Sequence, residues 1–391
     1  GNLSYTRNIK EDPVKEGLLY LGTENALYIS YDDGVNWQSL MSNLPPSPMY
    51  WIDIQEHFND LIIGTYGRGI WILDDISPLQ QLNENIEKKE SHLFDIKPSY
   101  RFQNVTSSLQ VLREASTGQS PPKGASINYW LKNSEDEIEI IITNQENDTI
   151  RKIKDKGTKG INRIWWNFST DKTNEIIFRT KPLYADWFSL DENRERKGEQ
   201  NFSILSPPGI YNITLKTAKS STTKPLQVIK DPNSEGTLED ISLQNELVTK
   251  IYDDLNLAIN HINSIENIRR QLLDLSSILK NSKQNKELMT MVEKLESSFL
   301  EIENQLVQLK ITGTGQDGVR FEKMIVEKLF YLASNIQISD FKPADSYLEV
   351  YKILKIRLSE ISKKLEILKE DKLKQTLKIL TDNGIEKVVM K

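Results

Sequence analysis

The chain has 391 residues, of which 50 are basic and 56 acidic, so its net charge is −6 and no basic surface for nucleic acid is expected. It has no cysteine, which excludes disulfides, cysteine nucleophiles and thiolate metal sites. No apolar run approaches the roughly 20 residues of a membrane span, and no leader opens the sequence, so we expect any export signal to lie upstream of residue 1.

Residues 1–90 form the first predicted domain, a β-meander. Between about Glu16 and Leu82, Gly, Asn-Asp and Pro-Pro turns separate the short apolar runs LLYLGT, ALYISY, LIIGTY and GIWILDD. This alternation of runs and turns is typical of antiparallel strands.

Residues 91–232 are predicted to form a two-sheet β-sandwich. The runs INYWLK, EIEIIIT, INRIWWNF, IYNITLKT and PLQVIK are short and alternating, with NSED and SPPG turns between them. A polar, charged stretch at about 169–200 is expected to be a long loop insertion. Because neighbouring strand residues face opposite ways, either Trp165 or Trp166 should face the core and the other should face outward. For the outer indole, packing between domains is preferred over stacking on a sugar.

Residues 233–391 are predicted to form an antiparallel bundle of about four helices. Apolar residues recur at steps of four and three across 288–309 and 347–368, a spacing typical of coiled-coil or bundle packing. A looser version covers 238–280, where Thr237 and Asp240 make a weak capping-box start. A shorter helix is expected at about 318–336, with KNSKQN and TGTGQDG as connecting turns.

The segment YISYDDGVNW, residues 28–37, suggests either a calcium loop or a tight structural turn. An EF-hand needs glutamate at its twelfth position, and counting from Ser30 that position holds Met41. No metal site is therefore predicted. In the structural alternative, a short acidic side chain accepts hydrogen bonds across the turn, Gly34 adopts a backbone angle closed to other residues, and Trp37 packs over the turn.

This turn matches the Asp-box or BNR repeat, Ser-x-Asp-x-Gly-x-Thr-Trp. Ser30, Asp32, Gly34 and Trp37 are in register, and Asn36 stands where threonine is usual. In that repeat family the residues have a structural role on the turns of β-propeller blades. The motif is moderately specific by itself and gains weight from the segments around it.

Nearly the whole chain resembles large bacterial sortilin-like BNR-repeat proteins, often labelled glycosyl hydrolases. The resemblance to their last propeller blades lies in GLLYLGTENALYISYDDGVNWQSLMSNLP and NDLIIGTYGRGIWILDD, and the resemblance to their tail lies in PPKGASINYWLK, KGINRIWWNF, PGIYNITL and GTGQDGVRFEKM. It implies a multidomain β plus α protein: terminal blades of an incomplete β-propeller, an immunoglobulin-like sandwich and a C-terminal antiparallel helical bundle.

The number of blades implies a partner. A propeller needs four or more blades of four strands, and residues 16–82 supply about one and a half. Isolated blades would leave sheet faces and edges exposed. We therefore expect the remaining blades upstream in the same polypeptide or in another chain.

The loop in GTYGRGIWILDD is the main candidate ligand site. Gly64, Gly67 and Gly69 lack the spacing of a dinucleotide or phosphate loop, so a turn closing the last blade is the preferred interpretation. The alternative is a ligand-facing loop in which Arg68, beside Tyr66, binds an anionic group.

No catalytic residue is predicted within the chain. Asp74 and Asp75 are adjacent strand residues that should point to opposite faces, so capping of the strand end is preferred over a glycosidase carboxylate pair. The three histidines, His57, His92 and His261, are far apart and lack metal-ligand spacing.

The preferred function is non-catalytic, and no cofactor is expected. The sandwich and bundle would present or dock a propeller that binds a peptide or glycan, within a cell-envelope or secreted assembly. Asp148, Thr149 and Ile150 resemble the short O-glycosylation pattern of exported Bacteroidetes proteins, which with the family resemblance indicates an extracytoplasmic location, in the periplasm, at the cell surface or secreted. The alternative is a glycoside hydrolase, sialidase-like or another BNR-repeat glycosidase, whose catalytic residues lie in upstream blades.

Overall fold

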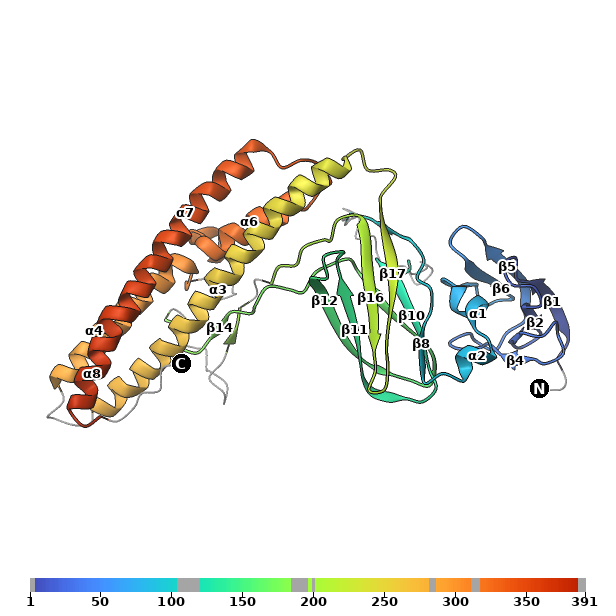
Figure 1. Ribbon diagram of the computed structural model, residues 1–391, viewed down its shortest axis with the longest axis horizontal. Helices are drawn as coiled ribbons and strands as arrows, with labels where there is room; N and C mark the ends of the chain where they lie inside the picture. Colours follow the sequence, from blue (N-terminus) through green and yellow to red (C-terminus); the bar gives the residue numbers. More distant parts are fainter. Residues whose placement is uncertain are drawn as a thin grey trace. The chain divides into compact units, whose positions relative to one another are not determined.

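The computed structural model describes residues 4–103, 120–183, 196–198, 201–280, 286–310 and 317–385. It shows a mixed β plus α protein, with several sheets followed by helices (Figure 1). The described residues divide into two compact units. Unit 1 contains those up to 102, 120–168 and 208–229, and unit 2 contains residue 103, those between 169 and 207, and those from 230 onward. No helix in these described ranges is long and apolar enough to cross a membrane.

Unit 1 begins with two small antiparallel sheets that share one core. The first, in strand order, consists of β1 (Thr6–Glu11), β2 (Leu19–Thr23), β3 (Leu27–Ser30) and β4 (Gln38–Ser39), and the second consists of β5 (Met49–Gln55), β6 (Asp60–Thr65) and β7 (Ile70–Leu73). The shared core contains Tyr20 and Ile29 from the first sheet and Ile52 and Ile63 from the second. β1 starts ten residues before the expected meander, because TRNIKE is a largely polar edge strand without a clear alternation.

Gly22 allows the two sheets to approach closely. A Cβ atom at this position would stand 2.7 Å from the backbone oxygen of Met49, which is closer than a real side chain can approach. The glycine in LYLGT is therefore required by packing between β2 and β5.

Two further sheets complete unit 1, joined to the first part by the short helices α1 (Ser77–Gln81) and α2 (Glu84–Glu87). One sheet has the order β13 (Gly160–Trp166), β10 (Ala125–Leu131), β8 (Ser91–Leu93). The other has the order β12 (Thr149–Gly157), β11 (Glu135–Thr143), β16 (Gly209–Lys216), β17 (Ser221–Lys230), β9 (Ser99–Arg101). The fully buried Trp166 of β13 contacts Tyr211 of β16 across the layer, with ring centroids 5.0 Å apart, while Trp165 is half-buried, as the alternation predicts.

Unit 2 is mainly helical. Its elements are β14 (Ile177–Phe178), β15 (Arg196–Lys197), α3 (Leu238–Lys280), α4 (Lys286–Leu306), α5 (Asp317–Arg320), α6 (Ile325–Ile336), α7 (Asp345–Ile367), a π-helical segment (Leu368–Leu373) and α8 (Lys374–Asp382). The predicted heptad positions of α4 and α7 lie in its core, among them Phe299 and Leu358. The predicted cap of α3 forms as well, because Asp240 accepts from the backbone N–H and hydroxyl of Thr237, whose hydroxyl oxygen accepts the Asp240 N–H.

The helices follow an up-down-up course. Ser276 contacts Glu293 through a hydrogen bond, and Arg269 further back on α3 contacts Glu296 further along α4, so this pair is antiparallel. By contrast, α7 runs parallel to α3, as the successive contacts Asp254 to Tyr351 and His261 to Ser362 show. The reason is that α6 returns the chain to the beginning of α3. The single helix expected at 318–336 is instead divided into α5 and α6. Most of the expected turn TGTGQDG lies outside the described residues.

The stretch expected as a loop insertion of the sandwich lies with the helices instead. Ile176, Phe178, Phe202 and Ile204 are buried in the helical core, so the described parts of 169–207 belong to unit 2. The two buried pairs, Ile176 with Phe178 and Phe202 with Ile204, are more than twenty residues apart, so no continuous period linked them in the sequence.

A row of polar side chains on α3 holds this segment. Asn256 accepts the backbone N–H of Asn174 at 2.8 Å, Asn263 accepts that of Ile177 at 2.8 Å, and Glu266 accepts that of Thr180 at 2.8 Å. These positions on α3 recur at helical spacing and face one side. The helix thus satisfies backbone donors that a neighbouring strand would otherwise satisfy.

Candidate functional site

The Ser30–Trp37 turn is closed by its own side chains. The Ser30 hydroxyl donates to Asp32 Oδ1 at 2.9 Å and accepts the Gly34 N–H at 2.9 Å. The Asn36 N–H donates to Asp32 Oδ1 at 2.8 Å, and its side-chain amide donates to Asp32 Oδ2 at 2.6 Å. Gly34 has a φ of 84°, and a Cβ there would lie 3.4 Å from the indole of Trp37. Ser30, Asp32, Gly34 and Trp37 therefore come together in this turn, and Asn36 supplies two donors to Asp32.

Both carboxylate oxygens of Asp32 are used within this turn. The backbone N–H and side chain of Asn36, with the hydroxyl of Ser30, hold the pKa of Asp32 below its ordinary value. In the part of the chain that the structure describes, no three His, Asp or Glu side chains gather as metal ligands. The local chemistry of this turn is that of a structural closure.

The outward face of the β5–β7 sheet carries three exposed apolar side chains. In one row of this face Trp51 of β5 pairs with Gly64 of β6, and Gly64 pairs with Ile70 of β7. In the next row the charged Asp53 pairs with Ile62, and Ile62 pairs with Ile72. Trp51, Ile70 and Ile72 are 64%, 74% and 58% exposed. No strand of the described residues pairs with the outer edge of β7. Exposed apolar side chains beside an unpaired edge strand are a combination that soluble proteins normally cover.

Tyr66 and Arg68 lie in an exposed loop beside this face. The loop is held by backbone groups: Tyr66 N–H donates to the Pro48 oxygen at 2.9 Å, and the Trp71 indole donates to the Arg68 oxygen at 2.9 Å. The Tyr66 ring is 71% exposed and lies 5.6 Å from that of Tyr50. Among the described residues the Arg68 guanidinium has no hydrogen-bond or ion-pair partner. The loop thus carries an exposed aromatic ring and, two residues on, an unpaired guanidinium, a combination suited to an anionic ligand.

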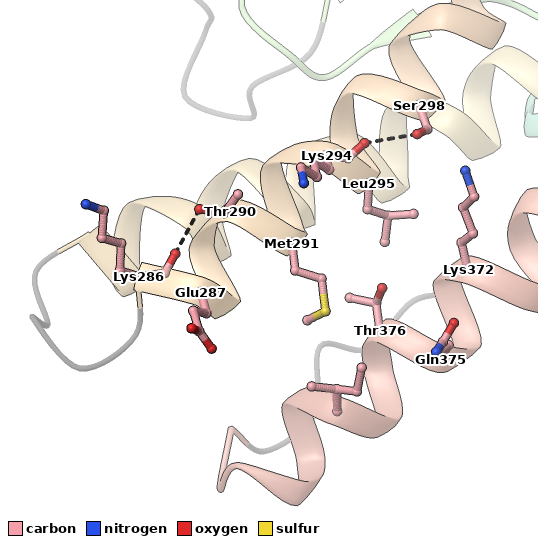
Figure 2. A pocket seen from close by; sticks show the side chains of 11 residues that line it. Lys286, Glu287, Thr290, Met291, Lys294, Leu295, Ser298, Lys372, Gln375 and Thr376 are labelled. Atoms are coloured by element: carbon pink, nitrogen blue, oxygen red, sulfur yellow. Dashed lines mark hydrogen bonds between the residues drawn. The ribbon is translucent and has the colours of Figure 1, made fainter.

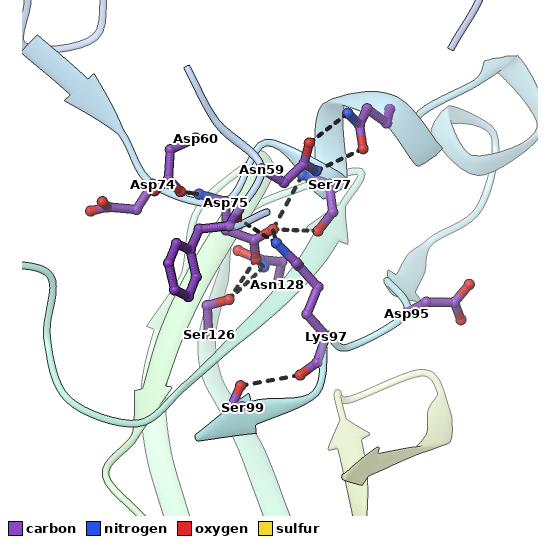
Figure 3. A network of polar contacts seen from close by, with 12 residues as sticks. Asn59, Asp60, Asp74, Asp75, Ser77, Asp95, Lys97, Ser99, Ser126 and Asn128 are labelled. Atoms are coloured by element: carbon purple, nitrogen blue, oxygen red, sulfur yellow. Dashed lines mark hydrogen bonds and ion pairs between the residues drawn. The ribbon is translucent and has the colours of Figure 1, made fainter. Parts of the chain in front are cut away.

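Asp75 forms a buried polar joint between the second sheet and the larger sheets of unit 1 (Figure 3). One carboxylate oxygen accepts from the Ser77 hydroxyl at 2.6 Å, and the other accepts from Ser126 at 2.5 Å and Asn128 at 3.1 Å. Lys97 is 3.9 Å away. Since Asp75 is only 7% exposed, these partners together replace its lost hydration.

Arg163 completes the joint from the backbone side. Its Nη1 and Nη2 atoms donate to the backbone carbonyl oxygens of Asp74 and Asp75, both at 2.6 Å. Its Nε donates to the side-chain oxygen of Asn128 at 2.7 Å. Burial lowers the pKa of Arg163, and the carboxylates of Asp75 and Asp74 oppose that change. Arg163 was not singled out by the sequence, and an arginine within an otherwise alternating strand was the only available signal.

The adjacent carboxylates Asp74 and Asp75 do not form a catalytic pair. Asp75 points into the joint, whereas the Asp74 side chain points away from it (Figure 3). Burial, with the nearby Asp60, raises the pKa of Asp74, and Arg163 partly counteracts this. The sequence favoured capping of the strand end. Asp75 has this role, because its carboxylate also accepts the Ser77 N–H at 3.3 Å.

The remaining candidate residues lie apart from one another. His57 is exposed, His92 lies in β8, and His261 of α3 contacts Ser362 at 2.9 Å. Burial lowers the pKa of both His92 and His261. Thr149, at the start of β12, is exposed and follows a turn closed by Asn144. O-glycosylation of Thr149 stays a prediction.

Comparison with known proteins gives no relative: no family model, no curated protein and no solved structure matches the chain.

Proposed function

We propose that this chain is a non-catalytic scaffold and binding region of an extracytoplasmic β-propeller protein. In this proposal the sheets β1–β4 and β5–β7 are terminal blades, the larger sheets are an immunoglobulin-like domain, and the helices form a bundle. These last two parts present the propeller or dock it in a cell-envelope or secreted assembly. The outward face of the β5–β7 sheet is the observation that carries the proposal.

The exposed side chains explain why a further sheet is the expected occupant of this face. Because the gain scales with the apolar area removed from water, burying the exposed parts of Ile70 and Ile72 would contribute roughly 1–2 kcal/mol each, and the larger Trp51 more. The opposite face of the same sheet already packs against residues of the first sheet, such as Tyr20 and Ile29. A further blade packed on the outward face would repeat that arrangement.

The unequal strand numbers point the same way. The first sheet has four strands, the number in a propeller blade, whereas the described second sheet has three and ends at β7. A fourth strand from the remaining blades, in the same polypeptide or another chain, would pair with β7. The loop of Tyr66 and Arg68 would then border the completed structure and take part in binding a peptide or glycan.

The polar network of Asp75 supports a structural role over a glycosidase role for this region. A glycosidase needs two carboxyl groups facing one bond, about 5–9.5 Å apart. Asp75 is held by Ser77, Ser126 and Asn128, which leaves it no free oxygen for a substrate. In the glycosidase alternative, the catalytic carboxylates would lie in the other blades.

Photo-crosslinking tests the proposal. A benzoylphenylalanine residue at position 72 in the protein produced by its own cell should crosslink to a β-sheet segment bearing the Ser-x-Asp-x-Gly-x-x-Trp pattern, identified by peptide mass spectrometry. The matched control is position 152, because Lys152 lies exposed on β12 and its ammonium group contacts no carboxylate of the described residues. Equal crosslinking at the two positions, or crosslinks at 72 only to unrelated sequences, would contradict the proposal.

A further inference from the structure

A groove lies in unit 2 between α4 and the helical stretch from Lys372 to Ile379, where the π-helical turns continue into α8. It has a volume of about 860 Å³, within the size range of ligand sites in proteins. Figure 2 shows side chains of both helical segments lining it. Because the groove belongs to the helical unit alone, a role for it does not depend on the proposed function.

The groove combines an apolar floor with a cationic rim. Met291 and Leu295 of α4 and Ile379 of α8 form the floor. The rim carries three lysines, Lys286, Lys294 and Lys372, whereas Glu287 is its one acidic lining residue among those described. An occupant that fits this lining is apolar on one side and acidic at its flanks.

The three rim lysines are available to a ligand. All three are exposed, and within the described ranges none has a carboxylate partner. Their neighbours differ in this respect, since Lys374 is paired with Glu370 and Lys369 with Glu366. Three lysines without a carboxylate partner among the described residues therefore line this groove.

The spacing of the lysines favours a helix over a small anionic amphiphile. Lys286 and Lys294 are eight residues apart on α4, which corresponds to about 12 Å along the helix axis. A single carboxylate or phosphate group contacts only ammonium groups within about 3 Å of itself. An amphipathic helix can instead place a carboxylate at every turn along the same length.

We propose that this groove binds an amphipathic helix of a partner protein. The apolar stripe of the partner helix lies on Met291, Leu295 and Ile379, and its acidic flanks face Lys286, Lys294 and Lys372. The interaction is a helix-in-groove contact that adds one helix to α4 and α8, with charge complementarity setting its preference for acidic partners.

Peptide binding to the whole chain tests this proposal. The probe is a fluorescein-labelled synthetic helix of about six turns with leucine at its a and d positions and glutamate at e and g, measured by anisotropy. We expect it to bind at least about tenfold more tightly than the same peptide with lysine at e and g. In the variant Lys294→Glu/Lys372→Glu this preference should reverse. Equal binding of the two peptides, or an unchanged preference in the variant, would overturn the proposal.

A thiol reporter locates the binding, because the chain has no native cysteine. The glutamate peptide should slow maleimide labelling of Gln375→Cys, which lines the groove, and leave Lys352→Cys on α7 unaffected. Protection of both thiols or of neither contradicts the assigned place. If dodecyl phosphate below its micelle concentration protects Gln375→Cys while the glutamate peptide does not, the groove takes a single-chain amphiphile and the proposal is overturned. Circular dichroism of each variant checks that the exposed substitutions leave the fold intact.

Discussion

Arg269 donates through Nη1 to Oε2 of Glu303 at 2.7 Å, joining α3 to α4 in the interior of the helical unit. The side chains are 2% and 0% exposed. Glu266 and Glu296 also contact the guanidinium, at 3.0 and 2.8 Å, so one cation serves three carboxylates. Burial, with the neighbouring Glu266, raises the pKa of Glu303 well above its ordinary value. The Thr180 hydroxyl donates to Glu266, so the cluster also ties this residue to both helices.

Arg269→Met is expected to destabilise the helical unit strongly. The substitution leaves buried carboxylates without their cation, and breaking a buried ion pair in this way costs about 3–5 kcal/mol. The measurement is urea unfolding followed by circular dichroism at 222 nm. Arg270→Met is the matched control, because the neighbouring Arg270 is half-buried and forms no ion pair with the described carboxylates. Equal losses in both variants would show that the cluster has no special role.

Glu303→Gln is expected to flatten the pH dependence of stability. Because the folded-state pKa of Glu303 is raised, the folded state keeps a proton that an unfolded glutamate releases above about pH 4.3. This contribution is complete below that pH and is lost as pH rises through the folded-state pKa. The melting temperature of the native sequence should therefore fall toward alkaline pH more steeply than that of Glu303→Gln. Parallel curves would contradict the assignment.

Asp75→Asn is expected to destabilise unit 1 by about 2–3 kcal/mol, the cost of losing hydrogen bonds to a charged acceptor. The introduced amide would direct its own donors toward Ser126 or Asn128, which donate to this position. The same change at Asp74 is the control and should alter the free energy of unfolding by no more than about 0.5 kcal/mol. Chemical denaturation monitored by tryptophan fluorescence distinguishes the two. A larger loss of stability in the Asp74 variant would contradict the assignment of Asp75 to the joint.

Asn263→Ala is expected to loosen the segment that lies along α3. The side chain accepts the Ile177 N–H and donates to the Glu175 oxygen at 2.9 Å, so its removal should cost about 1–2 kcal/mol. Hydrogen exchange should show faster exchange of the Ile177 amide with little change elsewhere in α3. Asn267→Ala, one turn along, is the control. Unchanged exchange at Ile177 would refute the role of Asn263.

Gly34→Ala is expected to destabilise the first sheet by about 1–2 kcal/mol, because its φ of 84° is unfavourable for residues with a Cβ. Gly209→Ala is the control, since a Cβ there meets open space. The native melting temperature should stay the same with EDTA or with added calcium, since both Asp32 oxygens already accept hydrogen bonds. A calcium-dependent rise in melting temperature would restore the metal-site interpretation.

Several local features could be predicted from the sequence because their causes lie within a few residues. The Ser30–Trp37 turn closes through side chains four positions apart, and Asp240 caps its own helix at Thr237. The alternation of β13 correctly predicted that only one of its two tryptophans is fully buried. The heptad positions of α4 and α7 predicted the core of the helical unit for the same reason, since helical periodicity is a local property.

The sequence by itself therefore determined the order of β and α regions, the turn at Gly34 and the buried stripes of the helices. Only the tertiary structure decided which distant residues share a site. Arg163 meets Asp75 from 88 positions away, and Arg269 meets Glu303 from 34. The direction of α7 and the docking of residues 174–180 on α3 also depend on such pairings. The physical reason is that a buried polar group must find its partner wherever the fold brings one, and no local period records that choice.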